Sequence, residues 1–185
     1  MSDLNGYLKE KRAAVLRREE ERIQRTDRAE SAVLTARVRA KGRTGVREIR
    51  IRDFQIISDS DPDFAGFNLG PNSAEIQLGV LGSCLTHVTL IQAASLGVPL
   101  NALEVEINGE LHPYAGKPGY EHVPFWPHHI RYTLHIDSPA EAGRIEELYE
   151  AVERVCPILN LLANPQQITG HIVHTTASGG SVLAT

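Results

Sequence analysis

The chain contains two cysteines, Cys84 and Cys156, and both stand where a reactive thiol would be useful. Cys84 lies in the stretch Gly-Ser-Cys-Leu-Thr-His within the most apolar segment, and Cys156 directly precedes Pro157. The 72 positions between them exclude a Cys-x-x-Cys motif, so the thiols can meet only if the fold brings two helices together. A redox pair is one interpretation. Two inert thiols that pack as small hydrophobic side chains are the other, because free cysteine is among the most buried residue types.

His87 follows Cys84 by three positions, which places both side chains on one face of a helix. A protonated imidazole there would lower the pKa of the thiol, and the two side chains could also share a metal ion. A tetrahedral zinc site needs four ligands, however, and the adjacent pair His128 and His129 stands without a matching motif. We therefore predict no metal and no cofactor, and we interpret His87 as a hydrogen-bonded core histidine.

The composition indicates one globular domain with a substantial core. Of the 185 residues, 42% are hydrophobic and 23% are charged. The net charge of -4 argues against a general nucleic-acid partner and against an anionic membrane surface. The first 28 residues are crowded with Lys, Arg and Glu and lack the apolar stretch of a secretory signal, so we expect a cytoplasmic protein.

The element pattern begins with a charged helix over residues 3–25, which we expect to lie on a surface or to strap across a partner subunit. From Ala32 the apolar period changes to two, and the Gly-Arg-Thr-Gly turn at 42–45 predicts a β-hairpin. A bulge or short turn near Asp53 leads to further alternating residues. Seven Arg or Lys residues between positions 37 and 52 make one face cationic, which we interpret as the solvated side of a half-buried sheet.

A long apolar helix is predicted to run from residue 73 to about Leu96. Asn72 and Glu75 form the Asn variant of a capping box at its start. Apolar residues cover most of its circumference, so we expect a central helix that is buried on nearly all sides. Its internal polar residues and the lack of basic flanks argue against a membrane span.

Two alternating segments, 103–107 and 130–136, predict a pair of strands. The linker between them is rich in proline and holds four of the aromatic residues: Tyr114, Tyr120, Phe125 and Trp126. Because such a segment is poorly suited to be a flexible tether, we interpret it as an ordered lid over an apolar pocket or as a dimer-packing loop.

A second helix is predicted to begin at the capping box 138–141, with Pro139 as its first residue, and to end at Cys156. Residues 167–174 predict a final strand. This order of elements indicates an α+β fold in which antiparallel sheet wraps around two packed helices. The predicted organisation is a charged helix at residues 1–30, a main domain at 31–176 and a flexible tail at 177–185.

Two segments resemble the motifs of one protein family. Residues 68–87, Asn-Leu-Gly-Pro-Asn-Ser-Ala-Glu-Ile-Gln-Leu-Gly-Val-Leu-Gly-Ser-Cys-Leu-Thr-His, are similar to the OsmC/Ohr motif, in which Gly-Pro-Asn-Pro precedes the helix with the reactive cysteine. Residues 155–158, Val-Cys-Pro-Ile, resemble the second cysteine motif of that family. The resemblance covers roughly residues 32–175 and leaves out the charged amino-terminal helix.

The resemblance implies an intertwined homodimer in which antiparallel sheets from both chains enclose two long central helices. It also implies a thiol-dependent peroxidase that reduces organic hydroperoxides in oxidative-stress defence. Cys84 would form a sulfenic acid, Cys156 would resolve it as a disulfide, and a dithiol reductant would restore both thiols. Because an apolar helix interior raises the pKa of a thiol above its usual value of about 8.5, the thiolate would need a nearby cation.

In the organic-hydroperoxide branch of the family, an arginine in a Gly-rich turn after the first strand activates the thiolate. Arg43, in the turn at 42–45, resembles that arginine. Arg37, Arg39 and Arg47 are alternatives in the same segment.

The branch's glutamate, which orients the arginine, falls ten residues before the cysteine, where this chain has Ala74. Glu75 comes one position later, on the opposite side of the helix from Cys84, and resembles the broader OsmC-like groups. This departure favours a second hypothesis, a non-catalytic OsmC-like protein that binds a small apolar or thiol ligand. The cysteine pair favours the peroxidase.

Overall fold

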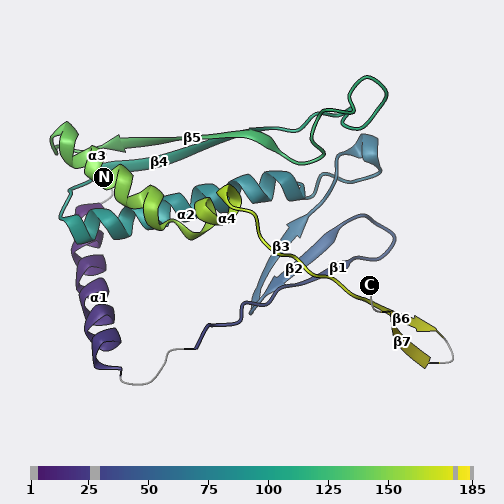
Figure 1. Cartoon of the computed structure of the whole chain (residues 1–185), viewed down its shortest axis with the longest axis horizontal. Helices are drawn as coiled ribbons and strands as arrows, with labels where there is room; N and C mark the ends of the chain where they lie inside the picture. Colours follow the sequence, from purple (N-terminus) through teal and green to yellow (C-terminus); the bar gives the residue numbers. More distant parts are fainter. Residues whose placement is uncertain (1–3, 26–29, 177–178, 184–185) are drawn as a thin grey trace.

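The structure is a computed structural model that describes residues 4–25, 30–176 and 179–183. Its elements are α1 (Leu4–Gln24), β1 (Arg37–Ala40), β2 (Arg47–Ile51), β3 (Phe54–Ser58), the 3₁₀ turn η1 (Pro62–Phe64), α2 (Ser73–Leu96), β4 (Ala102–Glu110), β5 (His128–Asp137), α3 (Ala142–Val155), α4 (Pro157–Ala163), β6 (Ile172–Thr176) and β7 (Gly179–Leu183) (Figure 1). The strands form three separate antiparallel sheets, with the orders β1-β2-β3, β4-β5 and β6-β7. The predicted α+β class with antiparallel sheets is confirmed.

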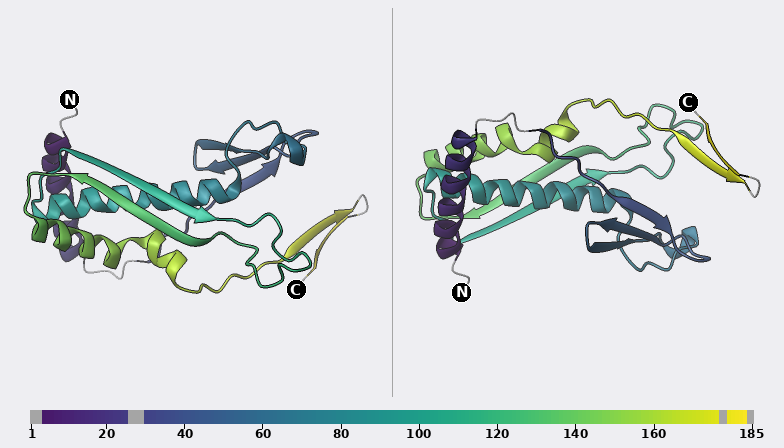
Figure 2. Two further views of the ribbon diagram at one scale, coloured as in Figure 1. Left: turned by 90° about the horizontal axis from the view of Figure 1, so that it is seen from above. Right: turned by 90° about the horizontal axis from the view of Figure 1, so that it is seen from below.

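Helix α2 is the centre of the main body. The β4-β5 ribbon runs along it on one side, α3 and α4 run along another, and α1 crosses its carboxyl-terminal end (Figures 1 and 2). The fully buried core residues come from α1, α2, the connection after α2, and α3 with its carboxyl-terminal residue Cys156: Leu8, Leu81, Leu85, Val88, Ala93, Ala94, Val98, Leu100, Leu148, Val152 and Cys156. Partly buried side chains of β4, β5 and α4 pack against them. Among the described residues, α2 is also the one helix long and apolar enough to cross a membrane. Within one chain only part of α2 is buried, so the prediction of a helix buried on nearly all sides was wrong for a single chain.

Both ends of α2 are fixed by local chemistry. The Asn72 side chain accepts hydrogen bonds from the backbone N–H groups of Ala74 and Glu75, and the Glu75 carboxylate accepts one from the Asn72 N–H at 2.8 Å. The predicted capping box is therefore confirmed. At the other end Gly97 takes the left-handed conformation, with φ 69°, that closes a helix most readily at glycine.

Helix α1 packs on its own chain. Leu8 is buried against the end of α2, and the Asn5 side chain accepts a hydrogen bond from the Leu100 N–H at 2.9 Å. Most other positions of α1 are exposed, in agreement with the predicted surface helix. The helix thus holds the turn that leads from α2 into β4.

The three-stranded sheet extends away from the helices (Figures 1 and 2). The predicted turn near Asp53 is present between β2 and β3, whereas residues 32–36 of the predicted first strand remain outside any strand. Val38, Ile49 and Ile56 lie opposite one another across the strands, and the Ile51–Phe54 pair shares their face. This face is largely uncovered, with Val38 exposed by 58% and Phe54 by 62%. The predicted half-buried sheet is therefore only partly covered within one chain.

Two predicted boundaries were wrong. Helix α3 begins at Ala142 and not at Pro139, because the Ser138 hydroxyl donates to the Pro99 carbonyl and accepts from the Ala140 N–H, which holds this segment as a turn. The last predicted strand, 167–174, begins only at Ile172. Of the predicted flexible tail, residues 179–183 pair with β6 as β7, while 177–178 and 184–185 lie outside the described residues.

The capping box yields a stability prediction. Replacing Asn72 with alanine leaves the Ala74 and Glu75 N–H groups without their acceptor, so the free energy of unfolding should fall by about 1 kcal/mol. Urea unfolding at fixed protein concentration measures the change. Ser73→Ala, at the exposed first position of α2, is the matched control and should change the stability by a few tenths of a kcal/mol at most. Equal losses in both variants would contradict this account of the helix start.

Candidate functional site

Cys156 occupies the break between α3 and α4. Pro157 has no N–H to continue α3, so Cys156 takes an extended conformation, with φ -67° and ψ 112°, and α4 begins with the proline. The Glu153 carbonyl, which Pro157 cannot satisfy, accepts a hydrogen bond from the Asn160 side chain at 3.0 Å. The break is thereby stabilised, and Cys156 lies at it, fully buried in the core that α3 shares with α2.

The two cysteine sulfurs meet at this break. The Sγ atoms of Cys84 and Cys156 are 3.6 Å apart, in van der Waals contact and well beyond an S–S bond of about 2.05 Å. Both residues are free thiols. Because Cys84 lies midway along α2, the packing of α3 and α4 on α2 is what joins two positions that the sequence separates by 72.

An open, mostly apolar cleft of about 470 Å³ exposes Cys84. One face of α2 forms most of its lining, and Ile158 of α4 closes one edge; the α2 residues are Ile76, Gly79, Val80, Ser83, Cys84 and His87. Cys156 lies beneath, behind Cys84. A ligand that enters the cleft therefore reaches the sulfur of Cys84 first.

The environment of Cys84 disfavours its thiolate. Burial raises the pKa of this thiol, and so do the hydrogen bond and the charge of Cys156, while the Ile158 backbone N–H acts in the opposite direction. Sequence reasoning missed the Ile158 contact. Its signal was Pro157, since a proline at the first helical position leaves the next N–H group pointing outward from the helix start.

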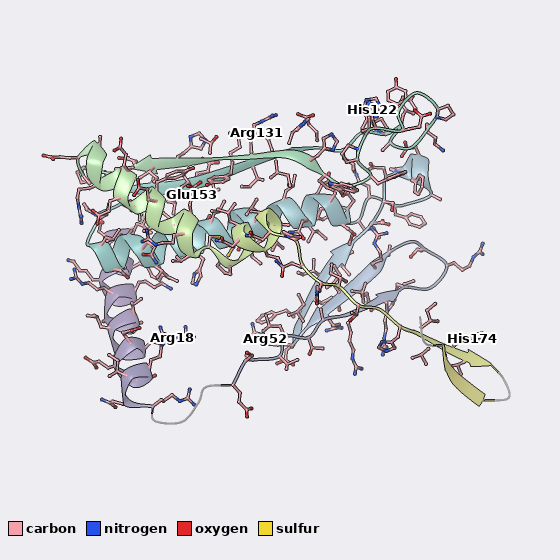
Figure 3. All side chains as sticks on the ribbon, viewed as in Figure 1. Arg18, Arg52, His122, Arg131, Glu153 and His174 are labelled. Atoms are coloured by element: carbon pink, nitrogen blue, oxygen red, sulfur yellow. The ribbon has the colours of Figure 1, made fainter. Side chains whose placement is uncertain are left out.

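A polar cluster holds the segment before Cys156 against the sheet. The hydroxyls of Tyr132 on β5 and Tyr149 on α3 donate to the carboxylate of Glu153 at 2.5 and 2.7 Å. Figure 3 labels Glu153 on α3. These bonds, chiefly the one from Tyr132, hold the pKa of Glu153 below its usual range. Glu153 therefore stays charged near neutral pH and anchors the last turn of α3, which sets the position of Cys156.

Within one chain, none of the arginines that were predicted to stabilise the Cys84 thiolate lines the described cleft. Arg43 is exposed in the β1-β2 turn, and no residue of this sheet belongs to the described lining of the cleft. Of the alternatives, Arg47 is committed to its own loop, where it donates to Ser58 Oγ at 3.0 Å and to the Asp59 carbonyl at 2.8 Å. Neither Arg37 nor Arg39 is among the described residues that line the cleft.

His87 and Glu75 lie in different places relative to the cleft. His87 lines the cleft and is exposed, so the interpretation as a core histidine was wrong; the helix face it shares with Cys84 is uncovered in one chain. Glu75 caps α2 and lies outside the described lining of the cleft, as expected for the opposite side of the helix. The aromatic linker is also absent from that lining, and Phe125 and Trp126 are exposed.

The sulfur contact predicts a disulfide within one chain. Diamide, a mild thiol oxidant, should join Cys84 to Cys156 without unfolding, because two sulfurs 3.6 Å apart need only a small rotation to bond. Intact mass should fall by two hydrogens, and peptide mapping should find the two cysteine peptides linked. Cys156→Ser is the control and should give no internal disulfide. Oxidation of wild-type protein that links only cysteines of different chains would contradict this geometry.

Comparison with solved structures identifies the fold. An OsmC-like protein from Mycoplasma pneumoniae matches with a TM-score of 0.63 at 19% identity, over 72% of this chain and 89% of that one. An OsmC-like protein of unknown function from Vibrio cholerae matches with a TM-score of 0.54 at 13% identity, over 71% and 94% of the two chains. An organic hydroperoxide resistance protein OsmC from Legionella pneumophila matches with a TM-score of 0.51 at 15% identity, over 72% and 91%.

The sequence comparisons identify the family. No curated protein matches the chain significantly. The sequence profile of the family described as OsmC-like protein matches residues 66–170, more than half of the chain, from the loop before α2 to the segment before β6. The matched region contains both cysteines and all the elements that bring them together. The chain therefore belongs to the OsmC-like protein family.

Proposed function

We propose that this chain is a thiol-dependent peroxidase that reduces organic hydroperoxides and works as a homodimer. The observation that carries the proposal is the contact of two free thiols, 3.6 Å apart, with one of them, the half-buried Cys84, lining an apolar cleft. The apolar lining suits the organic group of a hydroperoxide. Membership of a family that includes a hydroperoxide resistance protein supports the same conclusion.

The proposed chemistry uses the two thiols in turn. The Cys84 thiolate attacks the distal peroxide oxygen, the O–O bond breaks, and the leaving alkoxide takes a proton to become an alcohol. The sulfenic acid on Cys84 then reacts with the Cys156 thiol, which forms the disulfide and releases water. A dithiol reductant reduces the disulfide and is itself oxidised. A reducing cytoplasm would supply such a dithiol.

The homodimer is supported by two uncovered apolar faces in one chain. The sheet β1-β2-β3 exposes Val38, Phe54 and Ile56, and the cleft face of α2 exposes Val80. A second copy could lay its sheet over this face of α2, so that the two copies of α2 become the two long central helices. Burial of both faces would supply the hydrophobic stabilisation that one chain leaves unused.

Such a dimer would also supply the missing cation. The thiolate of Cys84 needs a positive charge because burial raises its pKa, and Arg43 of the same chain is not at the cleft. Arg43 of the second copy, carried on the tip of the covering sheet, would stabilise the thiolate. The active site would then combine residues of two chains.

A second function is favoured by one observation. In a single chain the balance of burial and hydrogen bonding raises the pKa of Cys84, and His87 is the only ionisable base among the described lining residues. If the dimer brings no cation to the cleft, the thiol stays protonated. The chain would then be a non-catalytic protein that binds a small apolar or thiol-containing ligand in the same cleft.

Peroxide consumption separates the two functions. Wild-type protein with a dithiol donor should consume cumene hydroperoxide, and Cys84→Ser should abolish the activity because it removes the attacking sulfur. After one equivalent of peroxide, the wild-type mass should fall by two hydrogens. Cys156→Ser, which keeps the attacking thiol, should instead gain one oxygen as a sulfenic acid. If wild-type protein consumes the peroxide no faster than the dithiol alone, the peroxidase proposal is wrong and the binding protein is the remaining function.

Subunit complementation tests the placement of Arg43. Arg43→Ala should lower the peroxide reaction at pH 7 by roughly tenfold or more, because each unit by which the thiol pKa rises removes about nine tenths of the thiolate. The rate should recover as the pH is raised above that pKa. Mixing Arg43→Ala subunits with Cys84→Ser subunits should restore about a quarter of wild-type activity, since half of the dimers would hold one complete site.

The control for this experiment is Arg50→Ala, which removes another exposed arginine of the same sheet and should keep the activity near wild type. No recovery after mixing, although the mixed dimers form, would show that Arg43 does not act across the interface. A pH profile for Arg43→Ala that superimposes on the wild-type profile would show that it does not act on the thiol at all.

A further inference from the structure

Three side chains with metal-binding atoms gather at the neck of the aromatic loop, residues 111–127. Glu110 is the last residue of β4 before the loop, and His128 and His129 are the first residues of β5 after it. The β-ladder pairs Glu110 with His128, just after a register shift between Asn108 and Glu110. Such a bulge re-aims the side chains around it, and here it brings the carboxylate beside both imidazoles.

The three side chains are close enough for one small ion to bind them all after small side-chain rotations. One ligand atom from each of the three residues lies within 4.8 Å of the others. His129 Nδ1 and a Glu110 carboxylate oxygen are 3.0 Å apart. Neighbouring ligands around a tetrahedral zinc ion lie about 3.3 to 3.6 Å apart, given metal–ligand bonds of about 2.0–2.2 Å. The ion would take the place of the hydrogen between His129 Nδ1 and the carboxylate, and the neutral imidazole would carry its hydrogen on Nε2 instead.

Contacts outside the cluster already orient its ligands. His128 Nδ1 lies 3.1 Å from the Trp126 carbonyl, which can only accept, so Nδ1 carries the hydrogen and Nε2 keeps its lone pair. This is the arrangement that metal-binding histidines commonly show. Arg131, on the side of the ribbon that faces away from α2, holds the other Glu110 oxygen at 3.4 Å (Figure 3). One carboxylate oxygen is thereby left for the histidines.

The backbone of His129 has an unusual conformation. Its φ of 48° lies in the left-handed region, which few residues other than glycine adopt. This conformation accompanies the edge-on packing of the two imidazole rings, whose centroids are 4.9 Å apart. The two histidines therefore stand side by side, although consecutive residues of a regular strand point to opposite faces.

We propose that Glu110, His128 and His129 bind a divalent transition-metal ion of the zinc type, with water completing the coordination. Two imidazoles and one carboxylate favour Zn²⁺ or Co²⁺ over Mg²⁺ and Ca²⁺, which prefer oxygen ligands. The ion would join the two ends of the loop and so act as a clip at its neck. This binding needs neither thiol and is independent of the peroxidase.

The clip would fix one wall of a second cavity. Glu110, Leu111 and Pro127, all at the loop neck, face the first turns of α2 across a cavity of about 200 Å³. The loop beyond the neck has its own contacts, including Tyr114 and Tyr120 with ring centroids 5.6 Å apart. A metal ion at the neck would therefore fix the two ends of the aromatic loop, whose interior already has contacts of its own.

Zinc competition and cobalt spectra test the site on the full-length, tag-free chain. Against a fluorescent chelator, wild-type protein should bind one Zn²⁺ per chain, and Glu110→Gln and His129→Asn should each weaken binding by at least about tenfold. Asparagine is chosen at position 129 because it tolerates a left-handed backbone. Cobalt should give the visible bands of a nitrogen and oxygen site, without charge-transfer bands from thiolate. Hydrogen exchange in residues 111–127 should slow on zinc addition in wild type only.

The matched control is His135→Asn, which removes an exposed histidine that also faces a carboxylate, Glu106 at 3.5 Å, but has no second histidine beside it. This variant should bind zinc as wild type does. The double variant Cys84→Ser, Cys156→Ser should also retain the site. Wild-type affinity in both Glu110→Gln and His129→Asn, or loss of the cobalt spectrum only when the cysteines are replaced, would overturn the proposal.

Discussion

The geometry of the site depends on one backbone constraint, the proline at position 157. Because Pro157 lacks an N–H, the helical path of α3 ends one residue earlier and Cys156 leaves it in an extended conformation. The side chain of Asn160 satisfies the carbonyl that the proline leaves open. Leu148, Val152 and Cys156 follow one another at intervals of four, so Cys156 continues the buried face of α3 that packs on α2. The break then starts α4 at this point, which brings the Ile158 N–H to the Cys84 sulfur. The packing of this face on α2 makes the sulfur contact, and the break adds the contact from α4 to Cys84.

The same packing that joins the thiols also limits their reactivity. Placing Cys84 against α4 and Cys156 removes water from its sulfur, and burial is the largest of the effects that raise its pKa. A single chain thus provides the sulfur pair but no arginine or lysine to stabilise the thiolate within the described cleft. It also leaves an apolar sheet face uncovered at the end of an extended arm. The proposed homodimer would supply both the charge and the cover, through a second copy whose three-stranded sheet lies over the cleft.

How well the sequence predicts a feature depends on how far apart along the chain the interacting residues lie. The start and end of α2 were predictable because a capping box and a C-terminal glycine act within a few residues. The start of α3 was not, because Ser138 bonds to Pro99, which is close only in the folded chain. The sulfur contact and the neck cluster share this limit. Glu110 meets His129 through the β4-β5 pairing, and the prediction of no metal rested on spacing alone, which gives no sign of that meeting.

The position of Glu75 has a consequence for how the proposed cation would be held. Its carboxylate caps α2 through the Asn72 N–H, and nine residues of helix, about 13.5 Å of axial rise, separate it from Cys84. It is therefore unsuited to orient an arginine at the thiol, and Ala74 has no group that could. Hydrogen bonds within the turn that carries Arg43 hold the backbone of this turn instead. Thr44 Oγ1 donates to the Lys41 carbonyl at 2.7 Å and accepts from the Val46 N–H at 3.3 Å, so the backbone of the turn, and not a carboxylate, would aim the guanidinium.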